Sequence, residues 1–256
     1  SAFTPGQPQW GTHLADTLTD LVRLHGAEAI AAVIVEPVSG STGVLIPPLG
    51  YLQRLREICD EHEIVLIFDE VIMVFGRLGR GFAADYFGVT PDLITCAKGL
   101  TNGAVPMGAV LTSNRIHHTL MQGPIDKIEL PHGYTCSGHP LACAAGLATL
   151  DVYQEEGLFE RAAGLEAYWQ EVAHALKELP GVLDIRTIGL LAAIDLEPIP
   201  DKPSRRAYDC HINCMNAGVM VRSTGDSMVL SPPRTVEKSQ IDQMFGVVAD
   251  ALKRNA

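Results

Sequence analysis

The sequence has no uninterrupted apolar run of about 18 residues, the length that a membrane-spanning helix requires. It also lacks the basic and then apolar pattern of an N-terminal secretory signal. Basic residues are in the minority, because 19 lysines and arginines stand against 30 aspartates and glutamates and give a formal net charge of −11. The composition therefore predicts no membrane anchor and no nucleic-acid interface.

Paired cysteine motifs are missing as well. None of the six cysteines belongs to a C-x-x-C pair, so we expect reduced thiols in a cytoplasmic enzyme. His132 and His139 flank Cys136, but no H-E-x-x-H or paired-cysteine spacing accompanies them. The sequence therefore predicts no metal site.

What the chain does contain is enough apolar material for a sizeable core, since 47% of its 256 residues are hydrophobic. Between the first two apolar runs, residues 51–63 place their leucines, Ile58 and Cys59 on one helical face. Strands that alternate with helices predict an α/β layer with a mostly parallel central sheet. The expected strands are 30–37, 64–71, 92–98 and 106–113.

The pattern changes after Pro140. An alanine-rich helical stretch, interrupted around Gly157, leads into short β-like segments and a closing helix. This mixture predicts a smaller C-terminal α+β domain. We place the boundary near Asp151, so that residues 1–151 belong to the large domain and residues 152–256 to the small one.

Asp69 and Lys98 stand at the ends of two expected strands, 29 residues apart, which suits one βαβ unit. One such residue alone is most often a charge where a strand meets solvent. Two of them, each followed by a glycine-containing turn, indicate a ligand site beyond the carboxyl ends of the strands.

An acid and a lysine on one sheet edge suit pyridoxal phosphate (PLP). The lysine binds the cofactor aldehyde covalently, and the acid keeps the pyridine nitrogen protonated. Once freed, the lysine can move the substrate's proton as a general acid and base. That work needs a desolvated amine, which we expect the apolar strand end to supply.

Three motifs in this order resemble the signature of the class III PLP-dependent aminotransferases. They are "FDEVI" with "FGRLG", "PDLITCAKGLTNG" with "VPMGAV", and "HGYTCSGHPLACAAGLATL". The resemblance covers nearly the whole chain and is closest to the ω-amino acid:pyruvate group. It implies a fold-type I transferase that moves an amino group from an ω-amino acid or amine, of the β-alanine type, to pyruvate.

The resemblance also implies roles for single residues. Lys98 is then the lysine that carries the cofactor, and Asp69 the partner of the pyridine nitrogen. Val71 packs against the cofactor ring. Thr135 corresponds to a threonine that reaches the cofactor phosphate of the neighbouring subunit, which implies a homodimer or homotetramer with a shared active site.

Substrate specificity is the next implication of the resemblance. Ornithine and γ-aminobutyrate enzymes resemble one another in a glutamate and an arginine that together clamp a carboxylate. This sequence has Ser41 and Val229 at those two positions and carries Arg222 in "VMVRSTGD" instead. Since an arginine fork binds carboxylates bidentately, Arg222 is the predicted site for the carboxylate of pyruvate or β-alanine.

The sequence departs from the family pattern at several places. Met73 and Val74 replace a Thr-Gly pair, and valine does not readily adopt the positive φ open to glycine, so we expect a rebuilt turn. Arg234 replaces an apolar residue, and the sequence gives it no function. No stretch before residue 30 supplies the family's phosphate-binding turn at a helix N-terminus.

We therefore expect this chain to be the C-terminal portion of such an enzyme. Two alternatives remain open from the residues alone. The same Asp69 and Lys98 would serve an aminomutase or a decarboxylase of this family. The chain by itself could also be an inactive fragment.

Overall fold

The first sheet carries the strands that the sequence predicts. The computed structural model describes residues 2–127, 130 and 132–255. The strand order is β1-β2-β3-β4, with β1, β2 and β3 parallel and β4 antiparallel to β3. All four expected strands are confirmed, each shorter at its ends, at Ala32–Val35 (β1), Val65–Asp69 (β2), Leu93–Cys96 (β3) and Ala109–Thr112 (β4).

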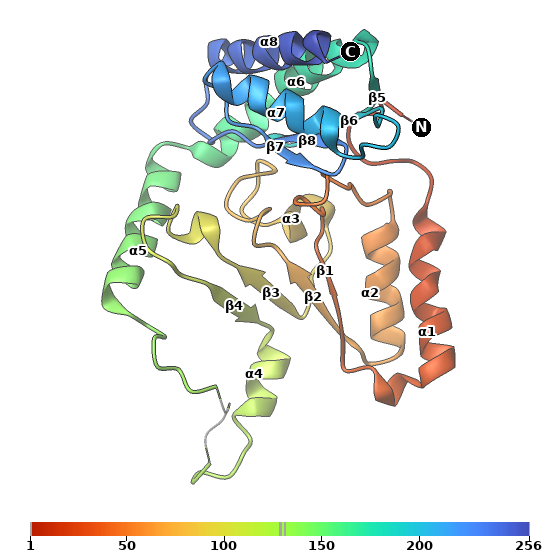
Figure 1. The fold of residues 1–256 in the computed structure, drawn as a ribbon. Helices are drawn as coiled ribbons and strands as arrows, with labels where there is room; N and C mark the ends of the chain where they lie inside the picture. The colour runs from red at the N-terminus through yellow and green to blue at the C-terminus, as the bar shows by residue number, and fades with distance from the viewer. Residues whose placement is uncertain (1, 128–129, 131, 256) are drawn as a thin grey trace.

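Helices on one side of this sheet bury the first core. Helix α2 packs on β2, and the N-terminal segment packs on α2 in turn (Figure 1). The helical face predicted between the first two strands is confirmed, because its Leu52, Leu55, Ile58 and Cys59 are buried. The helical segments are Thr12–Asp16 (η1), Thr17–His25 (α1), Ala27–Ala29 (η2), Tyr51–Glu61 (α2), Ala83–Phe87 (α3), Lys98–Leu100 (η3) and Asn114–Leu120 (α4).

Two consecutive helices lead away from the first sheet (Figure 1). Helix α5 covers Pro140–Glu155 and helix α6 covers Leu158–His174. The predicted interruption is confirmed at Gly157, whose φ of 57° is left-handed and breaks the helical hydrogen bonding. The expected domain boundary at Asp151 lies inside α5.

The C-terminal part is an antiparallel sheet under helices, an α+β arrangement as predicted. Its strand order is β5-β6-β8-β7, and α8 packs on both α6 and α7 above it (Figure 1). The elements are Ala175–Glu178 (η4), Val182–Ile188 (β5), Leu191–Leu196 (β6), Arg205–Asn216 (α7), Arg222–Thr224 (β7), Ser227–Leu230 (β8) and Lys238–Arg254 (α8).

The two sheets share a boundary of apolar side chains. Ile188, Leu191, Ala193 and Val229 of the second sheet belong to the core that the first sheet and its helices build. Loops that leave the first sheet therefore meet strands of the second at this boundary. Within the described part of the chain, no helix is both long and apolar enough to cross a membrane.

Candidate active site

A hollow of about 480 Å³ opens where the two sheets meet. Its wall combines the turn after β3, the loop before α2, and strands β7 and β8. The residues that line it include Ser41, Arg77, Lys98, Arg222, Val229 and Arg234. We call this hollow the Lys98 pocket. Four of these six residues are cationic, so the pocket suits an anionic ligand.

Lys98 opens the short helix η3, directly after β3. Its φ of 44° is left-handed, which is strained for a residue with a side chain and is typical of functional sites. Tyr153 of α5 holds the next residue, because its hydroxyl donates to the Gly99 carbonyl at 2.7 Å. The backbone therefore presents Lys98 in a fixed, unusual conformation.

The surroundings of Lys98 differ from the sequence-based expectation. The apolar strand end does not desolvate the amine, since the Lys98 side chain is exposed to solvent. The reason is geometric: the left-handed turn points the side chain away from the buried strand and into the pocket. Any covering of this amine has to come from a ligand or from outside the described chain.

Asp69 is the last residue of β2, one strand away from Lys98. It pairs with Thr95 across the parallel β2–β3 ladder, three residues before Lys98. The expected parallel pairing of these two strands is thus confirmed. One carboxylate oxygen of Asp69 accepts the Val71 N–H at 3.1 Å, and no other hydrogen bond to Asp69 occurs among the residues that the structure describes. An acceptor oxygen of Asp69 is left for a ligand.

Glu70 secures the chain that follows, a role that the sequence did not reveal. Its carboxylate is fully buried and accepts the N–H groups of Ala83 at 2.6 Å and Ala84 at 2.9 Å. Burial raises the pKa of Glu70, and these two hydrogen bonds oppose the rise. The loop between Glu70 and α3 is therefore tied down at both of its ends.

In the turn after Asp69, the left-handed backbone conformation lies at the residue that follows Met73 and Val74. Met73 and Val74 are buried in the core, and neither has a positive φ. Phe75 takes the left-handed conformation instead, with a φ of 59°, and its N–H donates to the Gly81 carbonyl at 2.7 Å. Val71, the residue expected against the cofactor ring, is half-buried at the start of this loop.

Arg222 and Val229 face one another across the β7–β8 ladder. Side chains of directly opposed residues lie on the same face of a sheet, which is why both line the Lys98 pocket. Ser41 lines it as well. The structure therefore brings Lys98 and Arg222 into one pocket, with Ser41 and Val229 beside them.

Thr135 lies elsewhere. It is exposed and lines a separate hollow of about 490 Å³ beside Tyr134, Cys136 and Met107. The structure does not bring Thr135 together with Lys98 and Asp69 in one chain. His139, next to this hollow, caps α5 by accepting the Leu141 N–H at 3.2 Å. Residues 2–127, 130 and 132–255 contain no cluster of three metal-ligating side chains.

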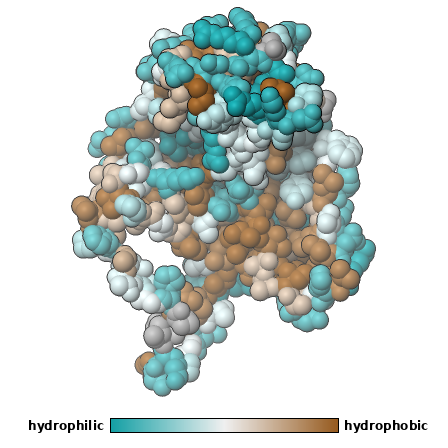
Figure 2. Space-filling model, in the orientation of Figure 1, coloured by the Kyte–Doolittle hydropathy of each residue, from teal (hydrophilic) through white to brown (hydrophobic). Residues whose placement is uncertain are grey.

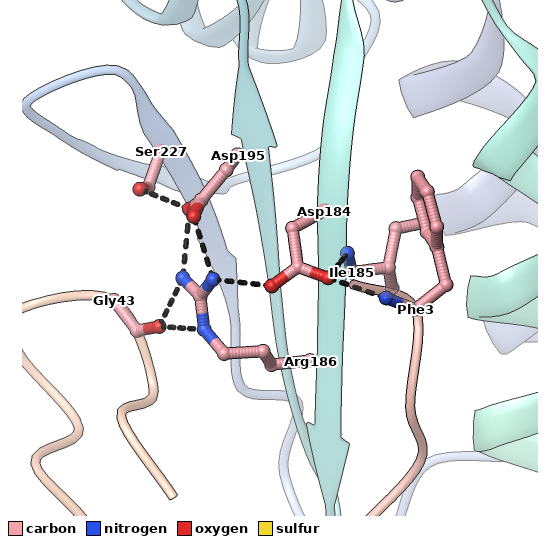
Figure 3. A network of polar contacts seen from close by, with 7 residues as sticks. All are labelled: Phe3, Gly43, Asp184, Ile185, Arg186, Asp195 and Ser227. Atoms are coloured by element: carbon pink, nitrogen blue, oxygen red, sulfur yellow. Dashed lines mark hydrogen bonds and ion pairs between the residues drawn. The ribbon is translucent and has the colours of Figure 1, made fainter. Parts of the chain in front are cut away.

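Arg186 supports the loop that carries Ser41 (Figure 3). Its guanidinium donates to the Gly43 carbonyl at 2.8 and 3.1 Å, and it binds the Asp195 carboxylate through two nitrogens at 2.6 and 2.7 Å. Asp184 adds a third ion-pair contact at 2.9 Å. The hydrogen bonds that Arg186 donates to Asp195 raise the pKa of Arg186 despite its burial. The network fixes one wall of the pocket to the second sheet.

The residues present fit PLP. The Lys98 amine is accessible and makes no ion pair in the described chain, and Asp69 has a carboxylate oxygen to offer a protonated ring nitrogen. Both come from the carboxyl ends of neighbouring parallel strands, where α/β proteins bind ligands. Bound PLP would supply an electron sink for bonds to the substrate's amino-bearing carbon.

Comparison with known proteins places the chain in a family. A protein-family model described as "Aminotransferase class-III" matches residues 3–252. An omega-aminotransferase of Caulobacter vibrioides is 59% identical over 96% of this chain. A beta-alanine–pyruvate aminotransferase of Pseudomonas aeruginosa is 49% identical over 98% of it. The chain belongs to the class III aminotransferases, which are PLP-dependent enzymes, and the family predicted from its motifs is confirmed.

Solved structures agree with the fold. An (S)-enantioselective omega-transaminase from Thermomicrobium roseum superposes with a TM-score of 0.89 at 37% identity over 95% of this chain and 55% of that one. An amine transaminase from an uncultivated Pseudomonas species, solved in a PLP-bound form, gives 0.88 at 37% identity, over 95% of this chain and 56% of that one. The chain spans 56% and 57% of the length of the two sequence relatives, a little over half.

Proposed function

We propose that the protein transfers an amino group from an ω-amino acid or amine of the β-alanine type to pyruvate, giving a semialdehyde or ketone and alanine. The observation that carries the proposal is the shared pocket of Lys98 and Arg222, with Ser41 and Val229 beside them. Two relatives with 49% and 45% identity bear the names of β-alanine and ω-amino acid:pyruvate aminotransferases.

Each site residue has a task in this proposal. Lys98 carries PLP and then moves the proton of the substrate carbon, as a positioned general acid and base. Asp69 keeps the ring nitrogen protonated, and Val71 supports the ring. Arg222 holds the carboxylate of pyruvate or of the ω-amino acid through paired N–H donors.

Thr135 suits a role in a neighbouring subunit, because it is exposed and separate from the Lys98 pocket of its own chain. We propose that it reaches the cofactor phosphate across the interface of a homodimer or homotetramer. A cytoplasmic location also belongs to the proposal. It is supported by the four buried free cysteines, Cys59, Cys96, Cys210 and Cys214.

The test separates amino transfer from the other chemistries that Lys98 and Asp69 could serve. A family-length version of the protein, loaded with PLP, is given β-alanine alone and then pyruvate alone. We expect one equivalent of semialdehyde in the first step and one of alanine in the second. Carbon dioxide release would indicate a decarboxylase, and a rearranged amine without alanine an aminomutase; either result would contradict the proposal. A 256-residue chain that folds but gains no PLP absorbance would be an inactive fragment.

A further inference from the structure

Two arginines, Arg77 and Arg234, lie together in the Lys98 pocket without an acidic partner. Both line this pocket and also a second, adjoining hollow of about 590 Å³, which residues of α5 border as well. Neither forms a salt bridge with any residue of the described chain. Burying a charge without a partner raises the free energy of the folded protein, and two such charges side by side also repel one another.

Arg77 is nearly sealed from solvent, with 9% of its surface exposed. Its Nη1 donates to the carbonyls of Pro232 at 2.6 Å and Leu190 at 3.4 Å, while its buried Nε has no hydrogen-bond partner among the described residues. Burial, and then the charge of Arg234, lower the pKa of Arg77 to about 10. Arg77 thus keeps its charge at neutral pH in an unfavourable place.

Arg234 is also a cation without an acidic partner in the described chain. Its Nη2 donates to the Val74 carbonyl at 3.1 Å, its Nε is buried without a partner, and its guanidinium lies 5.4 Å from the centre of the Tyr153 ring. Burial lowers its pKa as well. The contacts to carbonyls and the aromatic ring hold the cation in place but leave its charge uncompensated.

The pocket wall does not supply the missing negative charge. No aspartate or glutamate is among its lining residues, whereas Lys98 and Arg222 add two more cations. The one acid that lines the adjoining hollow, Glu156, is exposed and forms no ion pair with either arginine. This concentration of positive charge occurs in a chain with a formal net charge of −11. It favours a ligand that brings more than one negative charge.

We propose that Arg77 and Arg234 form a second carboxylate-binding position, so that the pocket accepts a small dicarboxylate with one carboxylate at Arg222 and the other at this pair. Arg222 and the Arg77–Arg234 pair line the same pocket, which is the arrangement that a ligand with two carboxylates requires. The inference rests on the proposed function for the role of Arg222. It extends the substrate or inhibitor class from monocarboxylates to dicarboxylates.

The test compares succinate with propionate, which is succinate without its second carboxylate, on the PLP-loaded, family-length protein. Dissociation constants are measured from ligand-dependent shifts of the unfolding temperature, which need no turnover. We expect succinate to bind at least about tenfold more tightly than propionate, as a second charge-assisted contact provides. Equal binding of the two acids, or tighter binding of inorganic phosphate than of succinate, would overturn the proposal.

Three variants locate the effect. Arg234→Gln should bring the succinate constant to within about twofold of the propionate constant and leave propionate unchanged. Arg234→Leu restores an apolar residue at this position and should give the same result, which guards against a folding defect of the glutamine variant. Arg222→Gln should weaken both acids. Arg205→Gln, the control, removes an exposed arginine of α7 and should change neither constant.

An unchanged preference for succinate in both Arg234 variants would refute the second position. The binding measurements need no turnover, so they are separate from the test of the proposed function. If the protein prefers succinate but does not transaminate pyruvate, the second carboxylate position is supported and the proposed reaction is refuted. If the protein transaminates pyruvate but binds both acids equally, the proposed reaction is supported and the second carboxylate position is refuted.

Discussion

At the scale of single residues, the site depends on where two strands end. The placement of Asp69 and Lys98 at the carboxyl ends of neighbouring parallel strands could be predicted, because continuous apolar runs mark buried strands of this kind. Arg77 could not be predicted in its role. It lies in an irregular loop without periodicity, and its main partner, the Pro232 carbonyl, is 155 residues further along the chain.

Asp69→Asn tests the acid in this pair. The amide cannot hold a ring nitrogen protonated, so we expect most of the transaminase activity to be lost, by roughly two orders of magnitude or more. The fold should persist, because the side chain's one hydrogen bond in the described chain, from the Val71 N–H, can still be accepted by the amide oxygen. The measurements are turnover with β-alanine and pyruvate, and thermal unfolding. Near-normal turnover would refute the assignment.

Arg222→Ala tests the carboxylate site. Losing a charge-assisted bidentate contact should cost on the order of 1.5–3 kcal/mol, which raises KM for pyruvate and for β-alanine roughly ten- to a hundredfold. An arylalkylamine donor has no carboxylate, so its half-reaction should change much less. Separate half-reaction kinetics with the two donors measure the difference. Equal losses for both would show that Arg222 is structural.

At the scale of elements, polar side chains connect segments that the apolar pattern leaves unrelated. Arg186 on β5 binds the loop at Gly43, 143 residues earlier, and so fixes the wall that carries Ser41 (Figure 3). The sequence predicts β5 as a short strand but says nothing of this contact, because strand alternation shows which face is buried and not what packs on it. The order of the elements was predictable, whereas the contacts that shape the pocket were not.

Arg186→Leu should destabilise the chain by about 2 kcal/mol, since it leaves the partly buried carboxylates of Asp184 and Asp195 without their cation. The matched control is Arg205→Leu, which breaks an exposed pair with Asp209 on α7 and should cost below about 1 kcal/mol. Urea unfolding monitored by circular dichroism compares the two. Similar midpoints for both variants would mean that the Arg186 network contributes no special stability.

Asp92 connects α2, β2 and α4 through its hydrogen bonds and ion pairs. Its carboxyl makes the free energy of unfolding depend on pH. Burial alone would raise its pKa, but hydrogen bonds from the Leu66 N–H and from the Arg56 and Arg115 guanidinium groups outweigh that effect and hold the pKa below its ordinary value. The unfolded chain therefore binds this proton at higher pH than the folded chain does. The stability from Asp92 is present above its unfolded pKa of about 3.9 and is lost as pH falls through the lower folded pKa.

Asp92→Asn should consequently be less stable than the unmodified protein at pH 6 and lose less further stability on acidification towards pH 3. Urea midpoints at several pH values measure both slopes. Asp250→Asn, at an exposed position on α8, serves as the control and should keep the original slope. An Asp92→Asn slope equal to the control's would contradict this account.

At the scale of the whole molecule, the pocket forms where two sheets with different strand patterns meet, and its surroundings are open. Figure 2 shows a broad apolar area around the first sheet, below the C-terminal helices. Ile34 of β1 is 62% exposed and Val110 of β4 is 61% exposed. Contiguous apolar surface of this kind marks contact with further protein.

The class of fold was predictable because the periodicity changes from buried strands to mixed short elements after Pro140. The openness of the site was not. The apolar run before Lys98 predicted a desolvated amine, but a left-handed turn aims it into the pocket, and local sequence does not encode which surfaces lie over it. Within the described chain, the Lys98 amine therefore stays accessible to a ligand.

The central claim is that Lys98 carries the cofactor, and covalent trapping tests it most directly. A family-length version of the protein is loaded with PLP, reduced with borohydride and digested, and the modified lysine is identified by mass spectrometry. We expect the pyridoxyl group on the peptide that contains Lys98, and no trapped adduct or turnover in Lys98→Ala, since the attachment point and the proton carrier are lost together. An adduct on any other lysine, or an undiminished adduct in Lys98→Ala, would contradict the account.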